Sequence, residues 1–344
     1  MTPALHDSPF LRACRREPVP TTPIWLLRQA GRYQSWYQEI RARVPFLDLC
    51  KTPDLVAEVT TRAVEQLGVD AAILFSDILL IVEPLGQELS FEKGDGPAIA
   101  NPVRSGKDVD RLRTPDVGEL GFVFEAVRRT RAALPATIPL IGFCGAPFTV
   151  AAYMCEGSTS RDFLLTKALM VRDEGAWHAL LERITMASID YLNGQIDAGV
   201  QAVQLFDSWV GALGPADYRR YVLPHVRRLV QGLRPLVPVI HFGTGTAALL
   251  ELMKEAGGDV IGLDFRVELD EAWQRLGDVA VMGNLDPAML LATPDIIRAR
   301  ARRILDQAAF RPGHIFNLGH GIFQETPVEN AIALVDAVHE LSAR

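Results

Sequence analysis

Short runs of apolar, often β-branched residues recur along the chain, and each is followed by a polar residue and then by a helical stretch. Runs that alternate so little between apolar and polar positions are typical of parallel strands buried on both faces. The pattern predicts eight such strands: Pro23–Leu27, Asp70–Phe75, Ile138–Phe143, Val200–Phe206, Val237–Phe242, Asp259–Leu263, Val279–Met282 and His314–Leu318.

The stretches between these runs carry residues that favour helix boundaries. Thr52-Pro53, Thr293-Pro294 and Thr326-Pro327 each place a capping hydroxyl before a proline at the first helical position. Gly68 and Gly199 follow helical stretches and are typical of C-terminal caps. We therefore expect three helices to begin, and two to end, at these positions.

Strand and helix alternate through eight strands, which predicts a parallel sheet, and eight is the number at which a (β/α)₈ barrel closes. We predict an α/β fold with a single barrel over residues 1–344, and an open doubly wound sheet is the alternative. The segment from Val82 to Asp116 is rich in glycine and proline and is predicted to be a loop-rich insertion after the second strand.

The composition is typical of a globular protein with a sizeable core, since 49% of the 344 residues are hydrophobic and 22% are charged. The net charge is −7, from 35 basic and 42 acidic side chains. Nucleic acids and anionic membranes favour basic surfaces, so we expect neither as a partner. Recognition of an anionic small molecule would depend on a few convergent arginines.

The apolar runs at 71–75 and 78–82 are too short to span a bilayer and are separated by Ser76 and Asp77. The first twenty residues mix charged and polar side chains and lack the apolar segment of a signal peptide. Four widely spaced cysteines without a C-x-x-C pair are typical of reduced thiols; they are Cys14, Cys50, Cys144 and Cys155. We expect a cytoplasmic protein.

In a barrel, chemistry takes place on the loops that follow the carboxyl ends of the strands. The polar residues at these positions are Arg28, Arg32, Asp77, Tyr153, Asp207, Ser208, His241, Asp264, Asn284 and His320. We predict that they line one end of the barrel, and a purely structural role is the alternative for each of them.

Arg28 and Arg32 lie four residues apart around Gly31. If this segment turns helically, both guanidinium groups face one side, where each can bind a carboxylate or a phosphate in a bidentate manner. The alternative is a pair of surface arginines that acidic neighbours neutralise.

Asp77 stands among apolar neighbours in Phe75–Leu79, where a buried carboxylate must be hydrogen-bonded, paired or protonated. It is predicted to serve N–H donors or a developing cation of a substrate, with bracing of a loop as the alternative. His320 lies between Gly319 and Gly321, which let the backbone approach a ligand closely, unless this histidine is simply packed in the core.

The sequence patterns point to no cofactor and no metal ion. Gly243–Thr246 lacks the continuation of a nucleotide-binding loop, and the histidines show neither H-x-x-x-H nor H-x-C spacing for zinc. No lysine ends a predicted strand, where a Schiff base would need one. We therefore expect a site without a cofactor.

Six blocks of the sequence resemble the uroporphyrinogen decarboxylase family. They are Leu27–Tyr33 (LRQAGRY), Phe75–Leu79 (FSDIL), Gly145–Thr149 (GAPFT), Leu205–Trp209 (LFDSW), Gly283–Pro287 (GNLDP) and Phe316–Gly321 (FNLGHG). The third block runs on to Tyr153 and Glu156-Gly157, and the blocks keep their order and spacing over nearly the whole chain.

The resemblance implies a distorted (β/α)₈ barrel that forms a homodimer and uses no metal or organic cofactor. It implies that the enzyme removes the four acetate carboxyls of uroporphyrinogen III to give coproporphyrinogen III. The catalytic residues that it implies are Asp77 and Arg28, with Asp77 accepting hydrogen bonds from pyrrole N–H groups. The substrate-binding residues that it implies are Arg28, Gln29, Ala30, Gly31, Arg32, Asp77, Tyr153, Ser208 and His320.

The chemistry of the residues agrees with this reaction, because a pyrrole protonated on a ring carbon becomes a cation that a fixed carboxylate stabilises. Asp77 has more apolar flanks than Asp207 or Asp264 and is the predicted anion. Two other functions stay open. A cobalamin-linked methyltransferase of a related barrel family would need a zinc site, and a non-catalytic tetrapyrrole carrier would need the arginines but no buried aspartate.

Overall fold

A computed structural model describes residues 2–92 and 96–344. Seven strands form one parallel sheet in the order β1-β4-β5-β6-β7-β8-β9. They are β1 (Ala72–Ile73), β4 (Leu140–Gly145), β5 (Ala202–Asp207), β6 (Val239–Gly243), β7 (Val260–Gly262), β8 (Ala280–Met282) and β9 (His314–Ile315). Each strand overlaps a predicted run. A doubly wound sheet reverses its strand order at a switch point, so the sequential order here excludes that alternative and confirms a distorted barrel.

The eighth predicted run, Pro23–Leu27, lies between the two edges of this sheet without forming a regular strand. Ile24 makes an isolated parallel bridge to Phe316, directly after β9. On its other side, the Ile24 carbonyl accepts a hydrogen bond of 2.8 Å from the Asp70 N–H, just before β1. Two further N–H groups of the run donate to side-chain oxygens instead of strand carbonyls. The prediction of a full strand is wrong here because these donors are diverted from the ladder.

Three strand starts are held by a reciprocal pair of hydrogen bonds, which we call a strand-start clamp. The N–H of one residue donates to the carbonyl of a neighbouring run, and the side chain of that same residue accepts the N–H in return. The pairs are Asp70 with Ile24, Gln201 with Leu140 and Asp259 with Val239, and every bond measures 2.8 Å. All three clamps lie at the amino ends of the strands.

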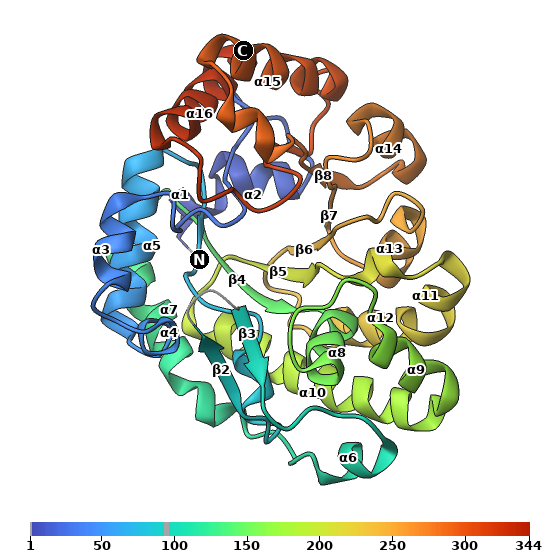
Figure 1. Ribbon diagram of the computed structural model, residues 1–344. Helices are drawn as coiled ribbons and strands as arrows, with labels where there is room; N and C mark the ends of the chain where they lie inside the picture. The colour runs from blue at the N-terminus through green and yellow to red at the C-terminus, as the bar shows by residue number, and fades with distance from the viewer. Residues whose placement is uncertain (1, 93–95) are drawn as a thin grey trace.

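Helices surround the strands, with α5 and α7 on the left of Figure 1, α13 and α14 on the right and α15 and α16 at the top. The helices of the outer layer are α5 (Pro53–Leu67), α7 (Gly121–Ala133), α8 (Pro147–Glu156), α10 (Glu174–Ala198), α12 (Leu223–Gly232), α13 (Leu250–Ala256), α14 (Leu269–Leu276), α15 (Pro294–Ala308) and α16 (Val328–Ser342). The other α-helices of the described residues are α1 (Pro3–His6), α2 (Pro9–Cys14), α3 (Ser35–Arg41), α4 (Phe46–Cys50), α6 (Gly106–Arg111), α9 (Leu164–Arg172) and α11 (Pro215–Tyr221).

Helix boundaries follow the sequence signals in part. Helices α5 and α15 begin at the predicted prolines, and α5 and α10 end before Gly68 and Gly199, whose φ angles of 69° and 114° are positive. The start predicted for α16 is wrong by one residue, because this helix begins at Val328 and Pro327 is its N-cap. The Thr52 hydroxyl does not cap α5, because it donates to the carbonyl four residues earlier at 2.6 Å.

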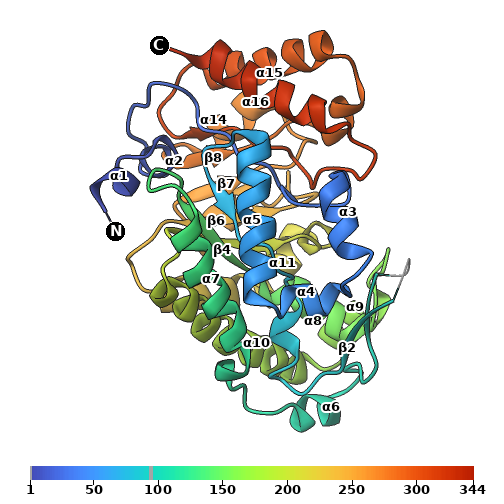
Figure 2. The ribbon, with the colours of Figure 1, turned by 90° about the vertical axis from the view of Figure 1, so that its left-hand side faces the viewer.

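The segment between β1 and β4 contains elements that stand apart from the barrel sheet. Strands β2 (Leu89–Glu92) and β3 (Gly96–Ile99) pair with each other in an antiparallel hairpin, and α6 follows. In Figure 2, β2 lies at the lower right, on the opposite side of the molecule from α1. Residues 93–95 of the predicted insertion lie outside the described residues.

Apolar side chains fill the space between the sheet and the helices. Trp25, Trp177 and Trp273 are among the largest fully buried side chains. The four cysteines are buried and free, as the sequence predicts. Among the residues that the structure describes, no helix combines the length and the apolar character that crossing a bilayer requires.

Candidate active site

Asp77 lies just beyond the carboxyl end of β1. The residue is partly exposed, and its carboxylate accepts a hydrogen bond of 2.8 Å from the Leu79 N–H. Residues 2–92 and 96–344 supply this carboxylate with no second hydrogen bond and no ion pair. Burial raises the pKa of Asp77 to about 6, because the Leu79 N–H and the charge of Arg28 offset only part of the desolvation. Asp77 is therefore mostly ionised at neutral pH and keeps one carboxylate oxygen available to a ligand.

Arg28 is exposed and adopts a φ angle of 61°, in the left-handed region that non-glycine residues rarely occupy. The helical turn that would place Arg28 and Arg32 on one side is absent from this segment, which is a series of turns in which the Gly31 N–H donates to the Gln34 side chain at 2.9 Å. The Arg28 side chain lies across Gly321. A Cβ atom on Gly321 would come within 2.5 Å of Arg28 Cδ, so only glycine leaves room for this position of the guanidinium.

The glycines around His320 make room for the protein itself. A Cβ atom on Gly319 would collide with the backbone N of Phe265, and one on Gly321 would collide with Arg28. A close approach of this backbone to a ligand stays a prediction, and the space that a Cβ atom would need is taken up by the protein. The small size of these two glycines lets the loops after β7 and β9 pack against each other and against the turn that carries Arg28.

His320 is half-buried, and its Nδ1 lies 3.4 Å from the Gly321 carbonyl oxygen. Burial lowers the pKa of His320, and the contact with this carbonyl offsets part of that effect. The positive charges of Arg28 and Arg266 lower the pKa further, and the charge of Asp264 opposes them. The imidazole is therefore neutral at pH 7. The predicted set does not include Arg266. Its position two residues after Asp264, a predicted strand-end residue, is the signal in the sequence that could have identified it.

Tyr153 on α8 belongs to the same group of side chains. Burial raises the pKa of its hydroxyl, and the charges of Asp77 and Arg28 act on it in opposite directions. Its ring packs against Trp209 with the ring centroids 5.9 Å apart. The structure thus brings together four of the predicted residues: Arg28, Asp77, Tyr153 and His320. Ser208, next to Trp209, is partly exposed at the end of β5.

The other residues of the LRQAGRY block differ in their exposure and in whether their side chains are free to contact a ligand. Arg32 is exposed and lies near Tyr37 on α3, where its charge lowers the pKa of that hydroxyl against the larger effect of burial. Ala30 and Gly31 are partly exposed. The Gln29 side chain is buried and bonded to backbone groups of the barrel wall, so a contact of Gln29 with a ligand would use its main chain.

Four other strand-end candidates are buried instead of lining the end of the barrel. Asp207 and His241 are fully buried, and Asp207 accepts a hydrogen bond of 3.0 Å from the Thr149 hydroxyl on α8. Asp264 is 1% exposed and accepts hydrogen bonds from the backbone N and Nη1 of Arg266 at 3.0 and 2.7 Å. Asn284, also buried, donates to the Asp264 carbonyl. The prediction that these side chains face a ligand is wrong, because each has a bonding or packing role inside the wall.

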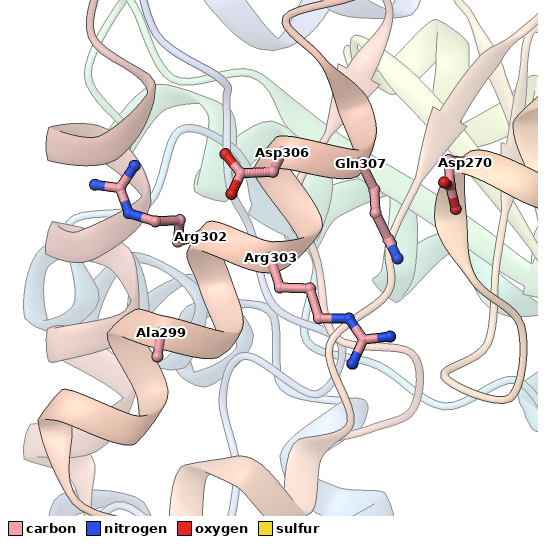
Figure 3. Close-up of a pocket in the computed structure, with 6 residues that line it drawn as sticks. All are labelled: Asp270, Ala299, Arg302, Arg303, Asp306 and Gln307. Carbon is pink, nitrogen blue, oxygen red and sulfur yellow. The ribbon is translucent and has the colours of Figure 1, made fainter.

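A surface pocket of about 500 Å³ lies elsewhere, between α14 and α15 (Figure 3). It is lined by Asp270, Ala299, Arg302, Arg303, Asp306 and Gln307. Arg303 and Gln307 both bond to Glu268, and the pocket contains none of the predicted site residues. Within the part of the chain that the structure describes, no three His, Cys, Asp or Glu side chains gather in a way that could hold a metal ion.

Comparison with known proteins identifies relatives over nearly the whole length. The family model for uroporphyrinogen decarboxylase (URO-D) matches residues 5–341. The uroporphyrinogen decarboxylase of Carboxydothermus hydrogenoformans is 54% identical over 338 residues, which cover 97% of this chain and 96% of the relative. The uroporphyrinogen decarboxylase of Sorangium cellulosum is 54% identical over 341 residues, which cover 98% of this chain and 97% of the relative.

Among solved structures, a methyltransferase from Methanosarcina mazei has a TM-score of 0.82 to this chain. The likeness covers 96% of this chain and 97% of that structure at 22% sequence identity, so it concerns the fold alone. The family match and the sequence identity, by contrast, extend through all six sequence blocks described above, and the chain belongs to the uroporphyrinogen decarboxylase family.

Proposed function

We propose that this chain decarboxylates the four acetate side chains of uroporphyrinogen III to methyl groups, giving coproporphyrinogen III and four CO₂ for tetrapyrrole biosynthesis. Membership in the family supports the reaction. The main structural support for this reaction is the Asp77 carboxylate, which is desolvated, has a pKa of about 6 and accepts a hydrogen bond from the Leu79 N–H. Arg28 stands beside it as the nearby positive charge.

The reaction needs an electron sink, and the substrate ring supplies it. A proton added to a pyrrole ring carbon gives an iminium-like cation. The bond between the acetate methylene and its carboxylate then breaks, its electron pair neutralises the cation and CO₂ leaves. A proton then adds to the methylene carbon while the ring carbon loses its own. Each acetate therefore consumes one proton overall and becomes a methyl group.

Asp77 stabilises the cation more than it stabilises the neutral ring, which is the condition for catalysis by differential binding. Two unit charges about 4 Å apart, at an effective dielectric constant of about 20, attract by about 4 kcal/mol. Because about 1.4 kcal/mol corresponds to a factor of ten in rate, this attraction represents about a thousandfold acceleration before desolvation is deducted. In this proposal, pyrrole N–H groups donate to the Asp77 carboxylate.

Arg28 binds a substrate carboxylate next to the reacting ring in this proposal and orients it. A guanidinium is a poor acid at neutral pH. His320 is neutral at that pH, since its pKa is lowered, and the raised pKa of Tyr153 makes its hydroxyl a weak acid. We therefore assign the incoming proton to water or to a carboxyl of the substrate. Arg32, Tyr153, Ser208 and His320, with the main chain of Gln29, Ala30 and Gly31, bind the periphery of the macrocycle.

The proposal takes residues 1–344 as one catalytic barrel that works in the cytoplasm as a homodimer. Exposed apolar side chains on α9 support a contact between two copies, because Leu164 and Val171 are 70% and 61% exposed. Light scattering on the purified protein measures the mass directly. A monomer mass at micromolar concentration would contradict the homodimer.

A product analysis with the Asp77→Asn variant tests the function. Wild-type protein, incubated without oxygen with uroporphyrinogen III, is expected to give a ladder of products from eight carboxyls to four. Asp77→Asn should bind the substrate but lose about a thousandfold in kcat. Asp278→Asn, on a side chain that is 96% exposed, serves as the control and should behave as wild type. Near-normal turnover by Asp77→Asn would contradict the role assigned to this carboxylate.

A further inference from the structure

Arg266 is a second basic residue beside His320 whose role the family blocks leave open. It follows β7 in the short turn 264–266, and its side chain is 52% exposed. The proposed substrate carries four acetate and four propionate groups, which together present eight carboxylates. In the proposed function, Arg28 and Arg32 bind two of these carboxylates, and six are left without an assigned basic partner.

The guanidinium of Arg266 is held on one edge and on one face. Its Nη1 donates to Asp264 Oδ2 at 2.7 Å, and its carbon Cζ lies 4.4 Å from the centroid of the Phe265 ring. Asp264 is fixed in turn, because it also accepts the Arg266 backbone N–H at 3.0 Å and the Gly245 N–H. Since one buried carboxylate binds a single nitrogen of the guanidinium, the exposed part keeps N–H donors for a second anion.

The turn that carries Arg266 is packed against the loop that carries His320. Gly319 leaves no space for a Cβ atom between itself and the Phe265 backbone, which brings the two loops into direct contact. The charges of both Arg266 and Arg28 act on the His320 imidazole. His320 therefore lies within electrostatic reach of two guanidinium groups, one from the turn before Gly31 and one from the turn after β7.

We infer that Arg266 is a further substrate-binding residue, which holds a peripheral carboxylate of the macrocycle next to His320 and thereby sets the affinity for the substrate. This inference rests on the proposed function. The four propionate carboxylates keep their charge throughout the reaction, whereas each acetate carboxylate leaves as CO₂. The group that Arg266 holds is therefore a propionate, and this contact strengthens the ground state and the transition state equally. Loss of Arg266 should therefore raise KM and leave kcat nearly unchanged.

Steady-state kinetics of Arg266→Gln with uroporphyrinogen III tests this assignment. KM should rise about tenfold, as expected for the loss of one charge-assisted contact, with kcat within about twofold of wild type. The dependence of kcat/KM on salt concentration should also weaken, which a purely structural role would not produce. Arg302→Gln, on an exposed arginine of α15 near the pocket in Figure 3, is the matched control and should change neither value.

A second variant keeps the test decisive if Arg266→Gln fails to fold because Asp264 loses a donor. The double variant Asp264→Asn with Arg266→Gln removes the buried charge together with its partner, and it should show the same rise in KM. An unchanged KM in a folded variant, or a fall in kcat alone, would overturn the inference. If wild-type protein gives the product ladder while the Arg266 variants match it, the assignment of Arg266 fails and the proposed function stands. If wild-type protein releases no CO₂, both fail.

Discussion

At the scale of single residues, the Asp77 carboxylate determines how the enzyme should respond to pH. Its pKa of about 6 means that the ionised form, which stabilises a cation, dominates at pH 7 and becomes the minor form below pH 6. We expect kcat/KM to fall about tenfold per pH unit below this value. A pH–rate profile of the wild-type enzyme measures the midpoint of this acid limb.

The charge of Arg28 lowers the pKa of Asp77, so its removal should move the acid limb to higher pH. We expect Arg28→Gln to show this shift together with a lower kcat/KM, because the same side chain binds a substrate carboxylate in our proposal. Arg302→Gln, remote from the site, should keep the wild-type midpoint. An acid limb that stays in place in Arg28→Gln would show that another group controls it.

The same raised pKa predicts that Asp77 destabilises the folded state at neutral pH. A carboxyl whose folded-state pKa lies above its ordinary value of 3.8 contributes most to stability below pH 3.8, and the contribution is lost as the pH rises through about 6. Asp77→Asn should therefore raise the free energy of unfolding at pH 7.5 by about 1–3 kcal/mol. Urea denaturation at pH 7.5 and pH 4 measures the gain, which should nearly vanish at the lower pH. A less stable variant at pH 7.5 would contradict this explanation.

At the scale of elements, the contact between the loop after β9 and the turn after Leu27 positions Arg28. Gly321→Ala adds a methyl group where the Arg28 side chain lies, so the guanidinium must move. We expect a loss of about 10–100-fold in kcat/KM with little loss of fold, because the neighbour that must shift is a long, exposed side chain. Gly121→Ala, at a helical glycine with open space around it, is the matched control. Unchanged kinetics in Gly321→Ala would mean that the position of Arg28 is not critical.

Elements with a strong local signal could be predicted from the sequence, and those that depend on distant partners could not. Seven apolar runs become strands because both of their faces are buried in the barrel. Pro23–Leu27 looks the same along the chain, but two of its N–H groups bond to side chains that lie far away in sequence, Asp70 and Asn317. Within the site, the proximity of Asp77 and Arg28 could be expected because each follows an apolar run that was predicted to be a strand, although only the run before Asp77 forms one.

The position of a residue after the carboxyl end of a strand does not determine whether its side chain is buried in the barrel wall or faces the active site. His241 and Asp264 end predicted strands as Asp77 does, yet the structure buries the first completely and leaves the second 1% exposed. Arg266, which follows Asp264 by two residues, stays exposed, and its guanidinium packs against the Phe265 ring. The direction of a side chain at a strand end depends on the loops packed against it, which the local sequence does not contain.

At the scale of the whole molecule, closure of the barrel depends on Asp70. Its Oδ2 accepts hydrogen bonds of 2.8 Å from the Ile24 N–H and from His339 Nε2 on α16, and this contact raises the pKa of His339. A histidine with a raised pKa contributes stability that is complete below pH 6.5 and is lost as the pH rises through the folded-state value. Asp70 thus joins the first run, the strand that follows it and the last helix.

Asp70→Ala should lower the free energy of unfolding by about 1–3 kcal/mol, because it leaves the Ile24 N–H and His339 without their acceptor. His339→Gln should lose stability at pH 6 and very little at pH 9, where the imidazole of the wild type is neutral. Urea denaturation of both variants at the two pH values checks this. Equal losses for His339→Gln at pH 6 and pH 9 would contradict a charged Asp70–His339 pair.

The strand-start clamps hold neighbouring strands at the end of the barrel that faces away from Asp77. Their donors and acceptors belong to residues at or just before the strand starts, and the candidate active site is built from residues after the strand ends. Mutations in the loops after the strands therefore leave the clamps that align the strands intact. The residues of the active site can change in evolution while the barrel keeps its fold. A barrel that shares 22% of its residues with a methyltransferase and still superposes on it is the outcome that this separation allows.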